Sequence, residues 1–282
     1  MIHRALCTGL LALGLAAPTP AAPTLGCLIE PDRVTDVGSP VVGVIDSVEV
    51  ERGERVAKGQ VLVVLRAGVE RAAFDAARAR ADANADLQAA AANAAFNRER
   101  LARAEDLFRQ NFISQQALDQ ARTEAQVADQ KLSQAREQQA ISAHERGMAA
   151  AQLQLRTIRS PIDGVVAERY MSAGERADDR PLLRIARIDP LRVQLVVPTA
   201  LYGRVHSGNA VDVVPDLPGA TPRSARVTMV DKVVDPASNT FRVQLSLPNP
   251  DHSLPAGLRC KADLGPAAPA AANGVVAQAR GR

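Results

Sequence analysis

The chain has 282 residues, enough for one large or two small domains, and 46% of them are apolar, so a packed core can form. Aromatic residues make up only 2%, which argues against a stacking platform for single-stranded nucleic acid and against an aromatic carbohydrate groove. The 34 basic residues exceed the 31 acidic ones by so little that the net charge of +3 does not indicate nucleic-acid binding. The four histidines and three cysteines are scattered, so no metal cluster is predicted.

The N-terminus has the pattern of an export signal. A weakly basic start precedes the apolar run Ala5–Ala17, which is shorter than the roughly 20 residues that span a bilayer. Small residues follow, and cleavage is expected near Ala21 or Ala22, so residues 1–22 are interpreted as a secretory signal peptide. A membrane anchor is the alternative interpretation of the same run.

Two cysteines remain after removal of the signal peptide, which contains Cys7. An even pair in an exported chain favours a disulfide between Cys27 and Cys260, because the compartment outside the cytoplasm is oxidising. Two free thiols are the alternative. Thr24–Cys27 also has a faint similarity to a lipobox, so lipidation of Cys27 is a third interpretation.

A long helical block occupies the middle of the chain. Residues 69–160 contain no proline and one glycine, and they are rich in strong helix formers. A single turn-like interruption is expected at Gln110–Ser114, with Ser114 as the N-cap of a second helix. Apolar residues recur at heptad spacing on both sides of it: Leu87, Ala94, Leu101 and Phe108 before it, Leu118, Ala121, Ala125, Ala128, Leu132 and Ala135 after it, and then, after a change of phase, Ile141, Met148 and Leu155.

This pattern predicts an antiparallel coiled-coil hairpin with a stutter in its second arm. Two helices of about 40 residues would each be on the order of 60 Å long. Alanine predominates in the predicted seam, so the two helices can approach closely. A pair of bundle helices in a globular domain is the alternative, but one narrow apolar stripe cannot support a bundle core.

The segments that flank the hairpin are repeats of each other. At an offset of 121 residues, the segment 39–64 aligns with 160–185 without gaps and with eight identities, where chance would give about two. Each copy has the pattern strand, Gly-Glu-Arg turn, strand, which is too little to be stable alone. The two copies are therefore expected to form one small β-sandwich, with the hairpin inserted between them.

Residues Gly43–Leu62 resemble a half-motif of biotinyl and lipoyl domains. In carrier domains of that family a tight turn with the modified lysine joins the two halves, whereas here about 90 residues of coiled coil separate them, and Lys58 is not at the modified position. The split arrangement resembles the periplasmic adaptor proteins, also called membrane fusion proteins, of the HlyD and AcrA kind. The resemblance implies an elongated multi-domain α+β fold, with an α-helical hairpin inserted into a split lipoyl-like β-sandwich and followed by an antiparallel β-barrel.

The hairpin turn carries a more specific match. Adaptors that dock on TolC-like channels have Arg, Leu, Ser and Asp around the tip at spacings of four, seven and five residues, which here are Arg103, Leu107, Ser114 and Asp119. The resemblance implies that these residues form a channel-docking tip. The alternative is that all four only stabilise the turn.

Composition and resemblance together divide the chain into seven parts. They are a signal peptide at 1–22, an N-terminal segment contributing to the barrel at 23–38, a first lipoyl-like half at 39–68, the hairpin at 69–158, a second half at 159–188, the barrel at 189–265, and a disordered tail at 266–282. The strand expected at 27–37 would bring Cys27 near Cys260.

The function implied by the resemblance is that of a periplasmic adaptor in a tripartite efflux pump. Its partners would be an inner-membrane transporter, RND-type rather than ABC-type, a TolC-like outer-membrane channel, and further copies of the chain in a six-membered ring. No enzymatic activity is predicted, and no catalytic, metal-binding or cofactor-binding residues, because no phosphate-binding loop and no His/Cys or Ser/His/Asp grouping occurs. An adaptor of an ABC-type exporter, a biotinyl or lipoyl carrier, and a freestanding coiled-coil scaffold are the alternatives.

Overall fold

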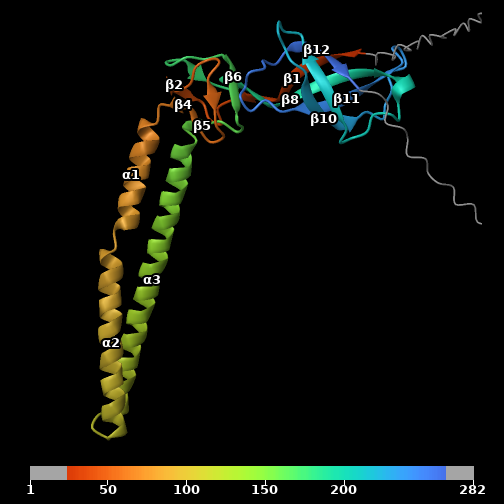
Figure 1. The fold of residues 1–282 in the computed structure, drawn as a ribbon. Helices are drawn as coiled ribbons and strands as arrows, with labels where there is room; N and C mark the ends of the chain where they lie inside the picture. Colours follow the sequence, from red (N-terminus) through yellow and green to blue (C-terminus); the bar gives the residue numbers. More distant parts are fainter. Residues whose placement is uncertain (1–23, 265–282) are drawn as a thin grey trace, which may run out of the picture. The chain divides into compact units, whose positions relative to one another are not determined.

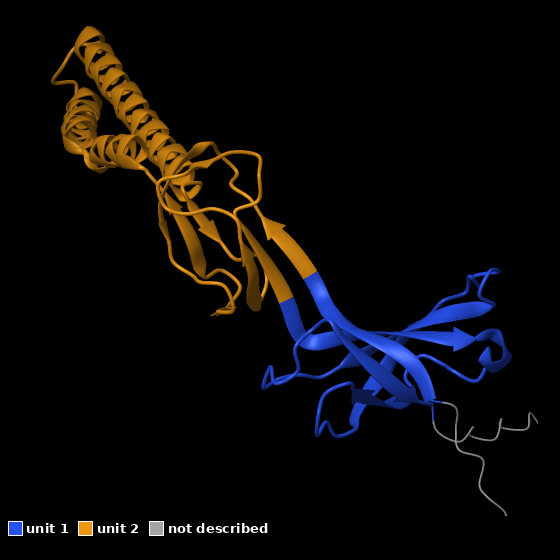
Figure 2. Ribbon diagram, turned by 90° about the horizontal axis from the view of Figure 1, so that it is seen from above, with its two compact units in different colours: residues 1–33, 187–282 blue, residues 34–186 orange. Residues whose placement is uncertain are grey.

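The computed structural model describes residues 24–264 and divides them into two compact units (Figure 2). Residues 24–33 and 187–264 form the first unit, and residues 34–186 form the second. The predicted signal peptide and the predicted disordered tail at 266–282 lie outside the described residues. Within 24–264, none of the helices combines the length and the hydropathy needed to cross a membrane.

The first unit is an antiparallel β-barrel. Its strands pair in the order β1-β12-β9-β10-β11-β8, and a further pairing of β1 with β8 closes the circle. Every second side chain along a strand points into the barrel, and these inward side chains are apolar. Leu191, Val193, Leu195 and Val197 of β8 fill the interior in this way. The strands are β1 (Thr24–Val37), β8 (Leu183–Pro198), β9 (Ala210–Pro215), β10 (Arg223–Val230), β11 (Thr240–Leu247) and β12 (Leu258–Asp263), with the 3-10 helix η1 (Thr199–Leu201) after β8.

The second unit contains a small sandwich and the helical hairpin (Figure 1). One sheet has the order β5-β4-β2-β7. In the facing layer β3 pairs with β6, and β6 pairs with the beginning of β8. Each layer therefore mixes strands from both repeats. The strands are β2 (Gly43–Val48), β3 (Arg55–Val56), β4 (Val61–Leu65), β5 (Thr157–Arg159), β6 (Gly164–Arg169) and β7 (Arg176–Ala177).

The two repeats are joined by reciprocal backbone hydrogen bonds. The amide of Gly53 in the first repeat donates to the carbonyl of Val166 in the second, at 2.8 Å. At the offset of 121 residues, Gly174 donates to the carbonyl of Ile45, at 2.9 Å. Both glycines have a positive φ, near 88° and 89°, which is why the turn of each repeat uses glycine. The turn of each half thus pairs with a strand of the other half.

The core of the sandwich repeats the same symmetry. Leu62 and its equivalent Leu183 are both fully buried in one cluster. Because each half contributes to a shared core, the hairpin is an insertion between two halves of one β module. The predicted fold class is confirmed.

A charged pair joins β1 and β8 within this unit. The guanidinium of Arg184 donates to both carboxylate oxygens of Asp36, at 2.7 and 3.1 Å, and lies 5.6 Å from the centre of the Tyr170 ring. The hydrogen bonds from Arg184 hold the pKa of Asp36 below its ordinary value. This pair therefore stabilises the fold at neutral pH, and its contribution is lost as the pH falls through the lowered pKa.

The first arm of the hairpin is broken, contrary to the expectation from the sequence. It consists of α1 (Gly68–Asp82) and α2 (Ala85–Arg109), whereas the second arm is the single helix α3 (Gln115–Gln154). The prediction of one interruption was wrong, because Ala83 takes an extended conformation between α1 and α2. Side chains of α3 bind the exposed end of α1: Gln139 Nε2 donates to the carbonyl of Ala81 at 2.7 Å, and Arg146 lies 3.5 Å from the carboxylate of Asp82. These contacts offset the lost helical hydrogen bonds.

The predicted seam of the second arm was wrong in its later half. The buried residues of α3 are Leu118, Ala121, Ala125, Ala128 and Leu132, as the heptads predict. Beyond them the seam keeps its register instead of changing phase, and Gln139 and Arg146 occupy it because they contact the end of α1. Ile141 and Met148 consequently face outward, with 50% and 63% of their surface exposed.

The close contact at Gly164 gives a stability test. A Cβ atom at residue 164 would lie 2.5 Å from the backbone carbonyl oxygen of Ala186, so Gly164→Ala is expected to lower the free energy of unfolding by about 1–3 kcal/mol. Gly43→Ala, at the equivalent position of the other repeat, would meet only side-chain atoms of Arg156 and Leu65, which can move. Thermal unfolding of both variants should show the larger fall in Tm for Gly164→Ala. Equal shifts would contradict this.

Candidate functional site

The candidate site is the tip of the hairpin, where α2 ends. Asn111 has φ near 65°, and the amide of Phe112 donates to the carbonyl of Leu107 while that of Asn111 donates to Phe108, both at 2.9 Å. These two bonds form a Schellman motif with asparagine at the left-handed position, which asparagine tolerates better than most residues. The motif stops α2 and reverses the chain within a few residues.

The second arm begins with a helix cap. Ser114 is extended, and its side-chain oxygen accepts a hydrogen bond from the amide of Ala117 at 3.3 Å. The carboxylate of Asp119 in the first turns of α3 accepts from Gln115 Nε2 at 3.0 Å and lies 3.6 Å from Arg122. A negative charge near a helix N-terminus is favourable because of the helix dipole. Ser114 and Asp119 therefore both stabilise the start of α3.

The other two predicted tip residues lie on one face of the last turns of α2. The guanidinium of Arg103 pairs with Glu99 at 2.8 Å, and both side chains are largely exposed. Leu107, one turn further, is 42% exposed. The structure thus brings all four predicted residues to one end of the hairpin, with Arg103 and Leu107 presented to solvent, and Ser114 and Asp119 engaged in local contacts.

Phe112 is a further tip residue, beyond the four predicted from the sequence. It is 73% exposed, although the chain has only five phenylalanines. The Schellman bond from its amide to Leu107 holds the two apolar residues at neighbouring points of the turn. The sequence signal was an aromatic residue directly after an asparagine in a predicted turn.

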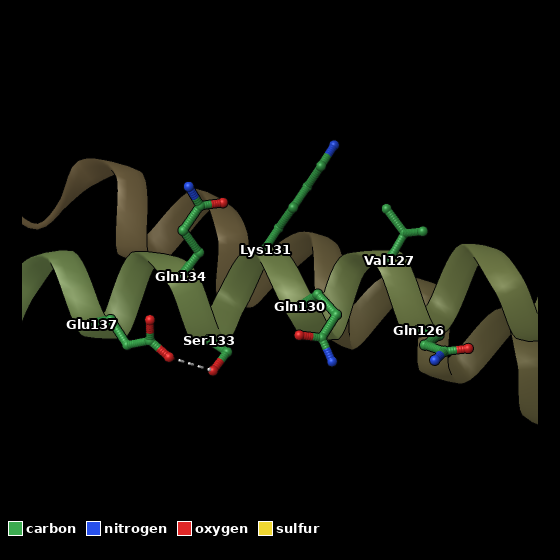
Figure 3. Close-up of a pocket in the computed structure, with 7 residues that line it drawn as sticks. All are labelled: Gln126, Val127, Gln130, Lys131, Ser133, Gln134 and Glu137. Atoms are coloured by element: carbon green, nitrogen blue, oxygen red, sulfur yellow. Dashed lines mark hydrogen bonds between the residues drawn. The ribbon is translucent and has the colours of Figure 1, made fainter.

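The outer side of α3 has a shallow hollow further up the arm (Figure 3). Its lining is polar except for one valine, and the side chains point into solvent: Gln126, Val127, Gln130, Lys131, Ser133, Gln134 and Glu137. The carboxylate of Glu137 accepts a hydrogen bond from Ser133 at 3.4 Å. Such an open surface of one helix has no enclosed volume for a small ligand. Residues 24–264 also contain no cluster of three or more His, Cys, Asp or Glu side chains that could hold a metal ion.

The two predicted disulfide residues lie opposite each other in the barrel. Cys27 of β1 pairs directly with Cys260 of β12 in the antiparallel register, and the structure joins them by a disulfide with their Cα atoms 4.8 Å apart. The bond connects strands near the two ends of the described chain, at a separation of 233 residues.

Comparisons with known proteins agree with this architecture. Residues 33–186 match the family described as CzcB-like, barrel-sandwich hybrid domain, and residues 191–268 match the CusB-like, beta-barrel domain. The chain belongs to the CzcB-like family of membrane fusion proteins. The first match covers the split sandwich together with its inserted hairpin.

Three relatives of this membrane fusion protein illustrate the likeness. The cobalt-zinc-cadmium resistance protein CzcB of Cupriavidus metallidurans is 25% identical over 83% of this chain and 42% of its own length, and an uncharacterized protein of Haemophilus influenzae is 26% identical over 85% and 56%. The chain therefore spans about half the length of these relatives. The crystal structure of MacA from Actinobacillus actinomycetemcomitans has the same fold, with a TM-score of 0.69, at 21% identity over 86% of this chain and 77% of that one.

The cap at Ser114 leads to a prediction for the turn. Ser114→Ala removes the side-chain acceptor and is expected to cost about 1 kcal/mol of helix stability, so the first turn of α3 should fray. Hydrogen exchange should show faster exchange of the Ala117 amide. Ser133→Ala, on the exposed middle of α3, is the matched control and should leave that rate unchanged. Unaltered exchange in Ser114→Ala would show that the cap is dispensable.

Proposed function

We propose that this protein is the periplasmic adaptor of a tripartite efflux pump, linking an inner-membrane transporter of the RND type to a TolC-like outer-membrane channel. The observation that carries the proposal is the hairpin inserted between the halves of a lipoyl-like sandwich, with Arg103, Leu107 and Phe112 exposed at its tip. The printed names of relatives support it: one is a metal resistance protein and another, from Alcaligenes, is a cation efflux system protein.

The tip has the chemistry needed to bind the helical ends of a channel. The Arg103 guanidinium offers donors to carboxylates or to the free carbonyls at a helix C-terminus. Leu107 and Phe112 supply an apolar surface that fits a groove between helices. Because Ser114 and Asn111 hold the turn rigid, little conformational entropy is lost when the tip docks.

The remaining parts have complementary roles in this proposal. The lipoyl-like sandwiches of several copies pack side by side into a ring, six copies being the expected number, and the barrel rests on the transporter. The ring and the hairpins together form a sealed conduit across the periplasm. The transporter supplies the energy, and this chain supplies the connection.

Substitutions at the tip test the proposed docking. Arg103→Ala combined with Leu107→Ala removes two exposed groups, and loss of one binding hot spot costs about 2 kcal/mol or more, which is roughly a thirty-fold loss of affinity. Pull-down of the TolC-like channel by the tagged adaptor should fall accordingly, and efflux by the host should be lost. The circular dichroism spectrum should not change, because both side chains lie on the surface.

Matched controls lie on the same arm, away from the tip. Arg78→Ala removes an exposed arginine that also pairs with a carboxylate four residues away, and Phe96→Ala removes an exposed apolar side chain. Both should leave channel binding unchanged. Normal efflux from the double tip variant would instead favour a coiled-coil scaffold without channel docking.

We also propose that the bond between Cys27 and Cys260 forms after export. Replacing both residues by serine is expected to lower the free energy of unfolding by about 2–4 kcal/mol, because the bond closes a long loop in the unfolded chain. Intact mass of the exported protein before and after reduction should differ by two hydrogens. An unchanged mass would exclude the bond, and an added lipid mass on Cys27 would show that this residue is the anchor.

A further inference from the structure

The outer face of α3 near the sandwich carries an apolar stripe. Ile141, Met148 and Leu155 follow at steps of seven residues and are all exposed. His144 and Ala151, also exposed, occupy the intermediate positions three residues further on. Steps of three and four are the spacing of a coiled-coil seam. We call residues 141, 144, 148, 151 and 155 the α3 stripe.

The partner of this stripe is not the protein's own first arm. The side of α3 that faces α1 bears Gln139 and Arg146, which bind the backbone and carboxylate at the end of α1. The α3 stripe is therefore a second heptad surface on the same helix. Exposed apolar residues in such a row are characteristic of interaction sites.

The outer face of α1 carries a complementary surface. Val69, which is 80% exposed, is followed seven residues later by the exposed Ala76. Ala72 and Ala79 are exposed at the intermediate positions, whereas the buried seam of α1 uses Ala77 and Ala81. We call residues 69, 72, 76 and 79 the α1 stripe. Its small side chains form a shallow face onto which large ones can pack.

The two stripes lie at the same height along the hairpin. Arg156 pairs with Glu70 at 2.6 Å, and Arg146 pairs with Asp82 at 3.5 Å, so the end of α3 from residue 141 onward runs antiparallel beside residues 69–82 of α1. Both stripes point away from the seam. One hairpin cannot bring its own two outer faces together.

We propose that the α3 stripe of one copy packs against the α1 stripe of a second copy of this chain. The inference rests on the proposed adaptor function and names the surface by which the bases of neighbouring hairpins associate. Ile141, Met148 and Leu155 would insert between the small side chains of the neighbouring α1. Because the two stripes differ, the contact is head-to-tail, and repeating it leads to a ring rather than a closed dimer.

The charges beside the stripes agree with this pairing. Arg80 comes directly after Ala79 of the α1 stripe, and Glu145 comes directly after His144 of the α3 stripe. The two residues lie at the same height in the antiparallel register. Within residues 24–264 neither side chain has an ion-pair partner. In a neighbouring pair of hairpins the two charges would flank the same side of the contact, as charged flanking positions do in coiled coils.

The contact is confined to the base of the hairpin. At the same heptad positions in the adjacent heptad of α3 stand Gln134 and Glu137, whose polar side chains point into solvent (Figure 3). Such short stripes cover less than the roughly 800 Å² per partner of a stable dimer, so a single contact is weak. Closure of a ring, together with other contacts between copies, would strengthen it by effective concentration.

Cysteine cross-linking in the periplasm of cells that express the full chain tests the contact. Ala76→Cys with Met148→Cys places one thiol on each stripe at matched height, and mild oxidation should give a ladder of linked copies on a non-reducing gel. Ala76→Cys with Gln134→Cys is the matched control, because Gln134 has the same heptad position two heptads away, about 21 Å along the helix. It should remain monomeric.

A charge exchange separates this contact from random collision. Arg80→Glu is expected to reduce the ladder of the Ala76/Met148 pair several-fold, and adding Glu145→Arg should restore it. Equal cross-linking of the Gln134 control, or no ladder from the Ala76/Met148 pair, would overturn the proposal. A link to a different protein instead of a second copy would also overturn it, and would identify a partner helix as the occupant.

The outcome is independent of the docking experiment at the tip. If the ladder is absent while the Arg103/Leu107 variant still loses channel binding, the stripe contact is wrong and the adaptor function stands. If the ladder forms while the tip variant binds and exports normally, the chain self-associates without the proposed docking.

Discussion

The two repeats hold each other in place by reciprocal backbone hydrogen bonds, and the position of the hairpin follows from this pairing. Each turn donates its backbone hydrogen bond to a strand of the other half, and both halves fill one core. Neither half has enough strands to fold alone. The two ends of the inserted segment must therefore meet, as the bond from the Leu65 amide to the carbonyl of Arg156 shows. An insertion whose ends are held together, and whose sequence is helical, can only leave and return as an antiparallel pair.

The same constraint determines where the ends of the arms interact with the sandwich. Arg156, just after α3, binds Glu70 of α1 and the carbonyl of Val42, so the base of the hairpin is held by a largely buried charged pair. From this base the alanine-rich seam lets the arms approach closely. The tip is then held at a defined distance by helices rather than by a loop, which suits the proposed role of the tip as a docking surface.

Different parts of the hairpin meet different physical demands. At the tip, the Schellman motif and the Ser114 cap satisfy the free backbone groups and leave Leu107 and Phe112 in solvent. At the break in the first arm, polar side chains of α3 replace the missing helical bonds. Near the base, Ile141 and Met148 face outward instead of filling the seam. The proposed contact between copies lies in this region.

The repeats, the long helices and the turn could be predicted from the order of the amino acids, because these features depend on local properties. The repeats are recognised because residues are identical at an offset of 121. The helices follow from the absence of proline over the helical block, and the turn follows from an asparagine and a serine, so both depend on the preferences of neighbouring residues. The family resemblance of the split sandwich and the choice of Arg103, Leu107, Ser114 and Asp119 rest on the same local patterns.

The folded chain was needed to establish which apolar heptads are buried and where the first arm breaks. Heptad spacing alone does not identify the helix against which a stripe packs, so Ile141 and Met148 could be assigned to the seam. In the structure Gln139 and Arg146 occupy the seam instead. The break at Ala83 costs helical hydrogen bonds, and it persists because side chains more than 50 residues away in sequence bind the free end of α1. Such contacts depend on the register between two helices, and this register is set by their packing rather than by the sequence of either helix alone.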